Sequence, residues 1–200
     1  MLPAGRAAYH RDVDASFDRI VTERLVLRRF EATDAPAFAR YRSIPGVARY
    51  QSWDAPYPIE RAQALVDWLH ERHPDEPGMW YQLAIALRTD PERLVGDCGF
   101  RSRVDEPLVV DIGFTLDPSV QGRGYGTEAG AALVRYLIED RGKHKICADC
   151  DTRNDASWRL LERLGFRREG ELRESFQDHG TWAGEYLYGL LASEWRDSRA

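Results

Sequence analysis

The run Gln121-Gly122-Arg123-Gly124-Tyr125-Gly126 carries the clearest chemical signal in the chain. Its alternating glycines allow a sharp backbone turn without side-chain clashes. The run lies between an apolar, strand-like segment, Val109 to Leu116, and a helix-like segment, Thr127 to Arg141. A glycine turn that enters a helix presents unpaired N–H groups and the positive end of the helix dipole, which together bind phosphate or pyrophosphate. The sequence therefore predicts a binding site for a phosphorylated cofactor.

Spacing distinguishes this run from two other phosphate-binding loops. A P-loop ends in Gly-Lys-Ser/Thr, whereas Gly126 is followed by Thr127-Glu128. A dinucleotide fingerprint needs G-x-G-x-x-G in an opening βαβ unit and an acidic residue about 20 positions later. Here the run reads G-x-G-x-G and lies past the middle of the chain. A third pattern, Gln/Arg-x-x-Gly-x-Gly/Ala, is satisfied in full, so the run favours that kind of loop.

A second polar segment, Asp151 to Ser157, follows the strand-like residues Lys145 to Asp149. A helix-like segment then runs to Gly165-Phe166. The Asn154 side chain could hydrogen-bond an amide, and Ser157 offers a hydroxyl group. In isolation this pair would be interpreted as the cap and first turn of a helix. Its position downstream of the glycine run favours a role in binding.

Together the two segments resemble the GNAT superfamily of N-acetyltransferases. The glycine run is similar to the family's pyrophosphate loop, and the second segment resembles its N-x-x-S-x-x-x-(L/Y)-x-x-x-G-F pattern. The resemblance extends from about Val21 to Arg196 and is closest to the RimJ/RimL-type branch, which comprises ribosomal-protein N-terminal acetyltransferases and small-amine relatives. It also rests on Thr22 to Arg28, Asp111 to Phe114, Leu164 to Phe166, Glu169-Gly170 and Glu194-Trp195.

The resemblance implies that acetyl-CoA is the co-substrate and that an acetyl group is transferred to a primary amine, on a protein N-terminus or a small molecule. It implies a donor site made of the central strand, the glycine run and the second segment. The expected cofactor-binding residues are Phe114, Thr115, Leu116, Gln121, Gly122, Arg123, Gly124, Tyr125, Gly126, Thr127, Asn154 and Ser157.

The resemblance also suggests catalytic residues. Many relatives carry a tyrosine as general acid four residues after the serine, but this chain has Leu161 there, so Ser157 is expected to take that role. Asp111, on the central strand, is the expected base. Glu106, Glu174 and Glu185 are alternatives, and each could equally be a salt-bridged or surface carboxylate.

Aromatic residues suggest where the acceptor amine would lie. The expected groove is lined by Tyr50, Trp53, Tyr57 and Trp182, although ordinary packing is an equally good explanation for them. Two further functions stay open. One is an aminoglycoside-type antibiotic N-acetyltransferase, and the other is a non-catalytic coenzyme-A-binding module.

Composition limits the remaining choices. The chain has 200 residues, which suits one domain, and a formal net charge of -5, which does not suggest nucleic-acid binding. No apolar run is long enough to span a membrane, and residues 1–20 lack a signal-peptide core, so a cytoplasmic protein is expected. The 3 cysteines include Cys147-x-x-Cys150, but no second ligand pair accompanies it, so no metal site is expected.

Residues 1–20 are expected to form an N-terminal arm, and the resemblance implies one GNAT domain over residues 21–197. It also implies the fold class, α/β (α+β), with a mixed, splayed β-sheet of about seven strands flanked by helices, and periodicity predicts the individual elements. A homodimer is possible through Arg167 to Leu191, and Gln177 to Gly180 is the expected hairpin turn. The expected strands are 24–30, 80–88, 94–100, 109–116, 145–149, 167–176 and 181–191, and the expected helices include 35–42, 59–73 and 127–141.

Overall fold

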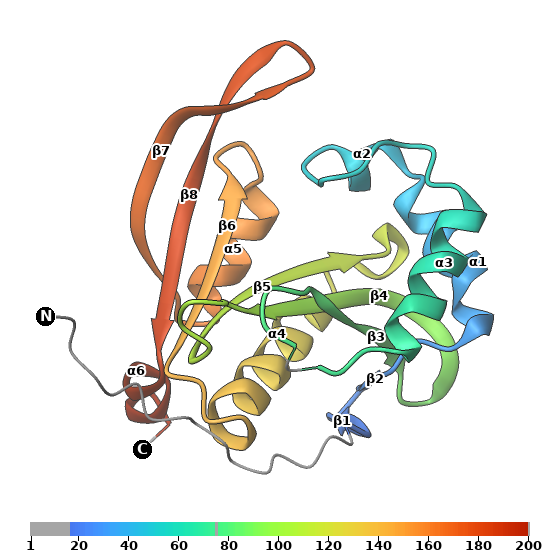
Figure 1. The fold of residues 1–200 in the computed structure, drawn as a ribbon, viewed down its shortest axis with the longest axis horizontal. Helices are drawn as coiled ribbons and strands as arrows, with labels where there is room; N and C mark the ends of the chain where they lie inside the picture. Colours follow the sequence, from blue (N-terminus) through green and yellow to red (C-terminus); the bar gives the residue numbers. More distant parts are fainter. Residues whose placement is uncertain (1–16, 75, 200) are drawn as a thin grey trace, which may run out of the picture.

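The computed structural model describes residues 17–74 and 76–199, which form one mixed eight-stranded sheet with the strand order β1-β2-β3-β4-β5-β6-β8-β7 (Figure 1). Neighbouring strands are antiparallel except β5 and β6, which are parallel. The strands are β1 (Arg19–Val21), β2 (Leu25–Arg28), β3 (Tyr81–Leu87), β4 (Asp90–Ser102), β5 (Val109–Leu116), β6 (Lys145–Asp151), β7 (Arg167–Asp178) and β8 (Thr181–Leu191).

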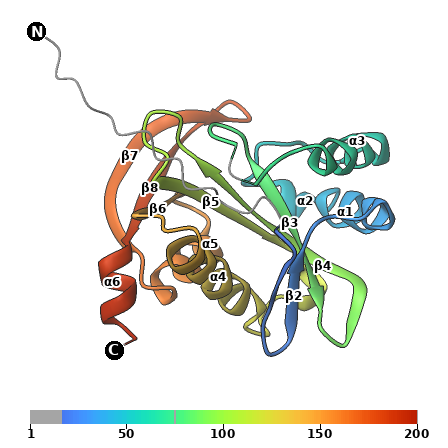
Figure 2. The same ribbon diagram turned by 60° about the horizontal axis from the view of Figure 1, so that its bottom comes forward.

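Helices cover the two faces of the sheet unequally. Helices α1, α2 and α3 lie on one face, and α1 packs against β4. Helices α4 and α5 lie on the opposite face against β2, β5 and β6 (Figure 2). The helices are α1 (Ala35–Arg42), α2 (Pro45–Ala48), α3 (Ile59–His70), α4 (Tyr125–Arg135), α5 (Asp155–Arg163) and α6 (Ala192–Asp197), with short 3-10 turns at Ala32–Asp34 and Pro118–Val120. Helix α4 continues as a π-helical turn, Tyr136–Asp140.

The predicted fold class is confirmed, and all seven predicted strands are present. The eighth strand, β1, has 3 residues and was missed because so short a segment has no readable periodicity. Its Ile20 is buried, and the buried Phe17 packs edge-on against Tyr136 with ring centroids 5.4 Å apart. The boundary predicted at residue 21 is therefore too late, because the core already includes Phe17. The rest of the predicted arm, residues 1–16, lies outside the described residues.

Strands β7 and β8 form a long hairpin that projects beyond the rest of the sheet (Figure 1). Its turn consists of His179 and Gly180, which have positive φ angles of 47° and 80°. Such turns match the natural twist of the two strands. The register shifts between Leu172 and Phe176, and within this bulge Glu174 has a φ of 49°.

Among the helices of the described residues, none is long and apolar enough to cross a membrane.

Candidate active site

The sheet splits between its two parallel strands. Strands β5 and β6 pair only where Val109 to Asp111 lie opposite Lys145 to Cys147. Beyond Asp111, β5 continues beside β4 alone, while β6 continues beside β8. Figure 1 shows β6 turning away from β5. The split leaves one edge of β5 without a neighbouring strand.

Backbone direction identifies which groups face the split. Arg103 N–H donates to Val109 C=O (3.0 Å) and Asp117 N–H donates to Val95 C=O (2.9 Å), so the odd-numbered residues of β5 bond to β4. Backbone groups alternate in direction along a strand. The N–H groups of Phe114 and Leu116, which lie beyond the last pairing of β5 with β6, therefore face the split. Unpaired strand groups of this kind bind an extended ligand that carries amides.

The glycine turn lies beyond the end of β5. Gly122 and Gly124 have φ angles of 74° and 80°, a region that only glycine adopts freely, and Gly124 caps α4. A Cβ on Gly126 would lie 3.3 Å from Leu116 Cδ1 and 3.5 Å from Leu160 Cδ2, so this glycine lets α4 approach both β5 and α5.

Backbone N–H groups around this turn are available to an anion. Within the described residues, the N–H groups from Arg123 to Thr127 donate to no protein acceptor, and the first helical bond runs from Glu128 N–H to Gly124 C=O at 3.1 Å. Unpaired donors at a helix N-terminus suit a pyrophosphate group. The turn therefore presents donors of the kind that the predicted pyrophosphate cradle requires.

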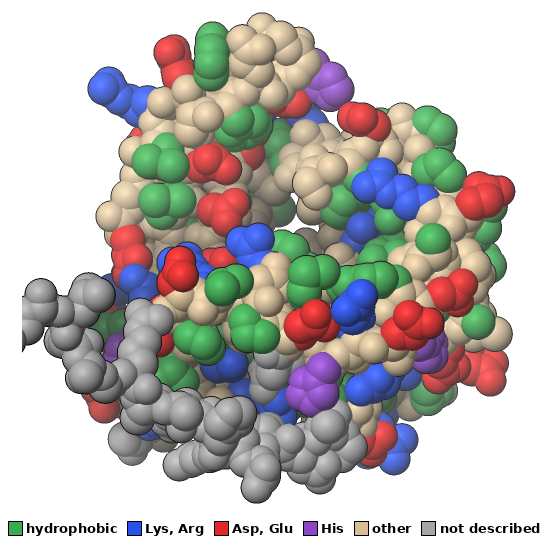
Figure 3. All heavy atoms as spheres, viewed as in Figure 1, with side chains coloured by type: hydrophobic (Ala, Val, Ile, Leu, Met, Phe, Trp, Pro, Cys, Tyr) green, Lys and Arg blue, Asp and Glu red, His purple; other side chains and the backbone are tan. Residues whose placement is uncertain are grey.

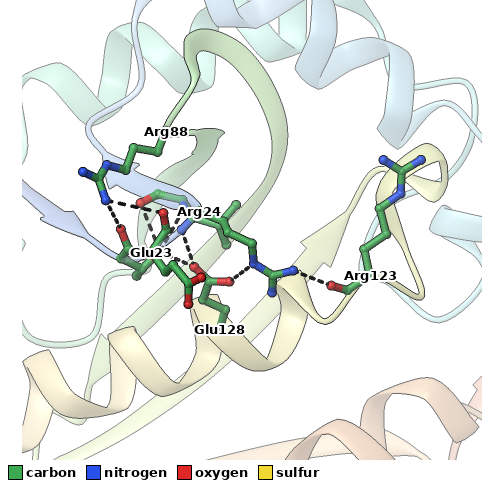
Figure 4. Close-up of polar contacts among 7 residues, drawn as sticks. Glu23, Arg24, Arg88, Arg123 and Glu128 are labelled. Atoms are coloured by element: carbon green, nitrogen blue, oxygen red, sulfur yellow. Dashed lines mark hydrogen bonds and ion pairs between the residues drawn. The ribbon is translucent and has the colours of Figure 1, made fainter.

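Arg24, from the segment between β1 and β2, fixes this turn from outside (Figure 4). Its Nε lies 2.6 Å from Glu128 Oε2, and its Nη1 donates to the Arg123 carbonyl at 2.9 Å. Its guanidinium also lies 4.7 Å from the centre of the Tyr125 ring. Thr22 donates its hydroxyl to Glu128 Oε1 at 2.6 Å.

Glu128 is accordingly held in its charged form. Burial alone would raise the pKa of its carboxyl group, but hydrogen bonds from Thr22 and Arg24 hold the pKa below its usual range. Sequence reasoning missed the Arg24 contact, because the two residues are 104 positions apart. The only signal in the sequence was that both belong to segments on which the family resemblance rests.

Asn154 and Ser157 lie at the start of α5. Asn154 Oδ1 accepts a hydrogen bond from Ser157 N–H at 3.2 Å, so Asn154 does cap the helix. The Cys150 thiol lies near the Ser157 hydroxyl, and its pKa is raised to about 11, chiefly by burial. Leu160, one turn later, is the residue that approaches Gly126. The fold therefore brings the second segment beside the glycine turn, as a shared donor site requires.

Asp111 does not suit the predicted role of base. It lies at the closed end of the split, opposite Cys147. Its carboxylate accepts hydrogen bonds from Arg101 at 3.0 Å and from Arg103 at 2.7 Å. Two guanidinium groups thus engage both oxygens, and the residue anchors these arginines. Of the alternatives, Glu185 lies on β8 and accepts a hydrogen bond from the Ser175 hydroxyl at 3.0 Å.

Asp149, on β6, is a better-placed carboxylate that sequence reasoning did not select. Cys150 faces α5, so the alternation of side chains puts Asp149 on the opposite face, where the split opens. Although its side chain reaches solvent, packing against the sheet raises the pKa of its carboxyl group, and the negative charges of Glu185 and Asp111 raise it further. A carboxyl group with a raised pKa is a more effective base near neutral pH.

The four predicted acceptor-lining aromatics do not form one wall. Tyr57 is only 5% exposed and lies in the core. Trp53 stacks on Arg42 of α1, with 3.9 Å between the guanidinium and the ring centre, and so helps to fix that buried arginine. Tyr50 lies 5.8 Å from the Arg153 guanidinium, and Trp182 is 55% exposed on the hairpin. Of the four, only Tyr50 and Trp182 stay candidates for direct contact with an acceptor.

Figure 3 shows a hollow between the β7–β8 hairpin and the α1–α3 side of the molecule. Acidic and hydrophobic side chains lie on the hairpin side of this hollow (Figure 3). Arg153 spans part of the same region, because it pairs with Asp178 near the hairpin turn at 2.7 Å and lies beside Tyr50. The face of the split opposite α4 and α5 is therefore open to an incoming acceptor.

Comparison with known proteins identifies this architecture. Residues 24–167 match the model of the acetyltransferase (GNAT) domain. The uncharacterized N-acetyltransferase YnaD of Bacillus subtilis (strain 168) is 30% identical over 176 residues, which cover 88% of this chain and 98% of the relative. The ribosomal protein uS5-alanine N-acetyltransferase of Escherichia coli (strain K12) is 26% identical over 191 residues, covering 90% of this chain and 94% of the relative.

A solved structure agrees with these relatives. The crystal structure of a GNAT-family acetyltransferase from Bacillus anthracis superimposes with a TM-score of 0.77 at 27% identity, covering 88% of this chain and 99% of that one. The relatives are named as enzymes, which argues against the non-catalytic alternative. The chain belongs to the GNAT family of N-acetyltransferases, with homologues that include RimJ-like ribosomal-protein acetyltransferases, as its glycine turn and second polar segment predicted.

Proposed function

We propose that the enzyme transfers the acetyl group of acetyl-CoA to the N-terminal α-amine of a protein. The observation that carries the donor half is two sets of N–H groups without a protein acceptor among the described residues, those of Phe114 and Leu116 on β5 and those from Arg123 to Thr127 at the glycine turn. The residues fit this donor, because strand N–H groups suit the amides of its pantetheine arm and the helix N-terminus suits its pyrophosphate. Gln121 supports the turn by donating its side-chain amide to the Leu116 carbonyl at 3.0 Å.

The same N–H groups would act on the reacting thioester. Attack by an amine places negative charge on the thioester oxygen, and preorganised N–H donors stabilise such charge. Phe114 N–H is the first donor of β5 beyond the closed end of the split. Ser157 would hydrogen-bond the departing sulfur, because it lies in the first turn of α5, the helix whose Leu160 approaches Gly126 of the glycine turn.

The acceptor must lose a proton before or during attack. An α-amine with a pKa near 7.8 is roughly 10–20% neutral at pH 7, whereas a lysine amine is below about 0.1% neutral. A single carboxylate such as Asp149, with its raised pKa, is thus adequate for an α-amine. We assign the proton-accepting role to Asp149 in place of Asp111, and the positioning of the cationic amine to Glu185.

The shape of the acceptor side supports a protein terminus. The hollow between the hairpin and the α1–α3 side opens to solvent, so a chain can extend out of it (Figure 3). The E. coli relative is named for an alanine of ribosomal protein uS5. An aminoglycoside is the second candidate, because Asp149 and Glu185 also favour a cationic antibiotic.

The predicted homodimer would use β7, the exposed edge strand of the sheet. Analytical ultracentrifugation would test whether the protein sediments as a dimer.

The test is acetyl transfer to defined acceptors. The enzyme is incubated with acetyl-CoA and a hexapeptide that begins with alanine, the same peptide with a dimethylated N-terminus, or kanamycin. Thiol release and product mass are measured. We expect release with the free peptide and an added acetyl group on its α-amine, and no release with the dimethylated peptide. Release with kanamycin alone would support the second candidate and overturn the first.

A further inference from the structure

Three strands place charged side chains in a row at the closed end of the split, on the acceptor face, which is the face of the sheet opposite α4 and α5. Arg101 of β4 lies opposite Asp111 of β5, and Asp111 lies opposite Cys147 of β6. The Leu116 side chain approaches α4, so alternation along β5 puts Asp111 on the acceptor face. Asp149 lies on the same face two residues beyond Cys147, about 7 Å further along β6.

The strand register gives two arginines to one of these carboxylates. Arg101 donates to Asp111 Oδ2 at 3.0 Å, and Arg103, directly after β4, donates to Asp111 Oδ1 at 2.7 Å. Opposite charges on facing residues of neighbouring strands attract each other. The Arg101 guanidinium also lies 5.1 Å from the centre of the Trp80 ring, which further restrains it. Guanidinium groups therefore engage both oxygens of Asp111.

Asp149 has no such partner. Within the part of the chain that the structure describes, no basic side chain forms an ion pair with its carboxylate, although the residue is exposed. Burial raises the pKa of the Asp149 carboxyl group, the negative charges of Glu185 and Asp111 raise it further, and the positive charge of Arg101 lowers it. Among the described residues, the charged and titratable groups that face Asp149 are Arg101 and Arg103 from the end of β4, Asp111 from β5, Cys147 from β6 and Glu185 from β8.

An ion pair between an arginine and Asp149 would weaken this residue as a base. A guanidinium bonded to a carboxylate stabilises its charged form and occupies the oxygens that would accept a proton. The side chains of Arg101 and Arg103 are 40% and 50% exposed, so burial alone does not fix them. Their ion pairs with Asp111 keep them at the closed end of the split.

We propose that Asp111 is a positioning residue for acetyl transfer: it holds the guanidinium groups of Arg101 and Arg103 away from Asp149, which stays free to accept the proton of the acceptor amine. This inference rests on the proposed function, because it takes Asp149 as the proton acceptor. In the transfer step the proton passes from the amine nitrogen to an Asp149 oxygen. The new C–N bond replaces the C–S bond of the thioester, and the sulfur leaves with the electrons of that bond. Asp111 neither gains nor loses a proton.

The direct test follows the titration of Asp149 by NMR with ¹³C-labelled aspartate, and Asp149→Asn identifies its resonance. Asp111→Asn should lower the Asp149 midpoint by about 1 pH unit or more, because a released arginine pairs with Asp149 and one negative charge is lost. Arg101→Gln should raise the midpoint, and by about 0.5 pH unit more in the Asp111→Asn background than in the unchanged enzyme. Equal effects of Arg101→Gln in both backgrounds would overturn the inference.

Steady-state kinetics with the hexapeptide that begins with alanine gives a second readout. Asp111→Asn should lower kcat/KM roughly tenfold and move the acid limb of the pH profile to lower pH, together with the Asp149 midpoint. Adding Arg101→Gln should restore most of the lost rate, because it removes the competing cation. A base that is lost cannot be restored in this way, so a loss that persists in the double variant would overturn the positioning role.

Controls distinguish this role from general damage. Asp34→Asn also removes a carboxylate whose two oxygens accept bonds from an arginine, Arg28, at 2.7 Å and 2.9 Å, but on the β2 side of the sheet. It should lower stability and leave the Asp149 midpoint unchanged, and an equal shift in this variant would overturn the inference. All variants should keep the calorimetric Kd for acetyl-CoA. The expected NMR coupling in an enzyme that acetylates no peptide would support the placement of the arginines and overturn the proposed function.

Discussion

Arg24 and Glu128 join the start of the chain to the N-terminal turn of α4 through an ion pair of 2.6 Å. The same guanidinium donates to the carbonyl of Arg123, inside the glycine turn (Figure 4). The cradle is therefore held by a contact between remote segments, in addition to its own glycines. Because a preformed site loses less conformational entropy when it binds, this contact should increase affinity for acetyl-CoA.

Removing the Arg24 side chain should loosen the glycine turn. We expect Arg24→Ala to raise the Kd for acetyl-CoA about tenfold, a loss of about 1.4 kcal/mol, as measured by calorimetry. Arg88→Ala is the matched control, because the Arg88 side chain donates to the Thr22 and Glu23 carbonyls of the same segment, and its backbone bond to the Arg24 carbonyl survives the substitution. Equal losses in both variants would show that the turn does not depend on Arg24.

Glu128 should give stability a measurable pH dependence. The pKa of its carboxyl group is lowered in the folded protein from a reference of 4.5, so its contribution is present above pH 4.5 and is lost as the pH falls through the folded value. Glu128→Gln should lower the free energy of unfolding by about 1–2 kcal/mol at pH 7. Denaturant unfolding from pH 7 to pH 3 should show this difference shrinking in acid, and a constant difference would contradict the assignment.

Substitution of Gly124, compared with substitution of Gly142, distinguishes a loss of anion binding from the effect of backbone strain alone. Gly124→Asp places a carboxylate where the pyrophosphate should lie, next to Arg24 Nη2 at 3.3 Å from the new Cβ. Gly142→Asp is the control, because Gly142 also has a positive φ (65°) and open space around it but lies after α4. Both changes should cost about 1 kcal/mol of stability. Only Gly124→Asp should abolish acetyl-CoA binding, so retained binding would contradict the cradle.

Removing the Ser157 hydroxyl should lower kcat without changing the affinity for acetyl-CoA. Its backbone N–H, which Asn154 caps, survives substitution, so Ser157→Ala should leave the helix intact. We expect kcat to fall roughly tenfold to a hundredfold while the Kd for acetyl-CoA changes little, and Ser157→Thr to restore part of the rate. An unchanged kcat in steady-state assays would remove Ser157 from the chemistry.

Local pattern was sufficient for most of the fold. Alternating apolar residues marked the central strands, and the glycines of residues 122–126 marked the turn before α4. Short elements were not predicted from the sequence, because β1 has 3 residues and α2 has 4, too few to show a periodic pattern. Helix α4 begins at Tyr125 and not at Thr127, because the capping residue is Gly124.

The site was predictable only where it depends on contiguous residues. The glycine turn and the Asn154–Ser157 pair are such residues. Asp111 was assigned as a base because sequence does not reveal its pairing across strands with Arg101 and Arg103.

Amide hydrogen exchange, measured by NMR with and without acetyl-CoA, tests the central claim most directly. Without ligand, the N–H groups of Phe114 and Leu116 should exchange faster than those of Gly113 and Thr115, which bond to β4. Acetyl-CoA should protect Phe114, Leu116 and the turn from Arg123 to Thr127 and leave Gly113 and Thr115 unchanged. Binding without protection of either the split or the turn would contradict the donor site described here.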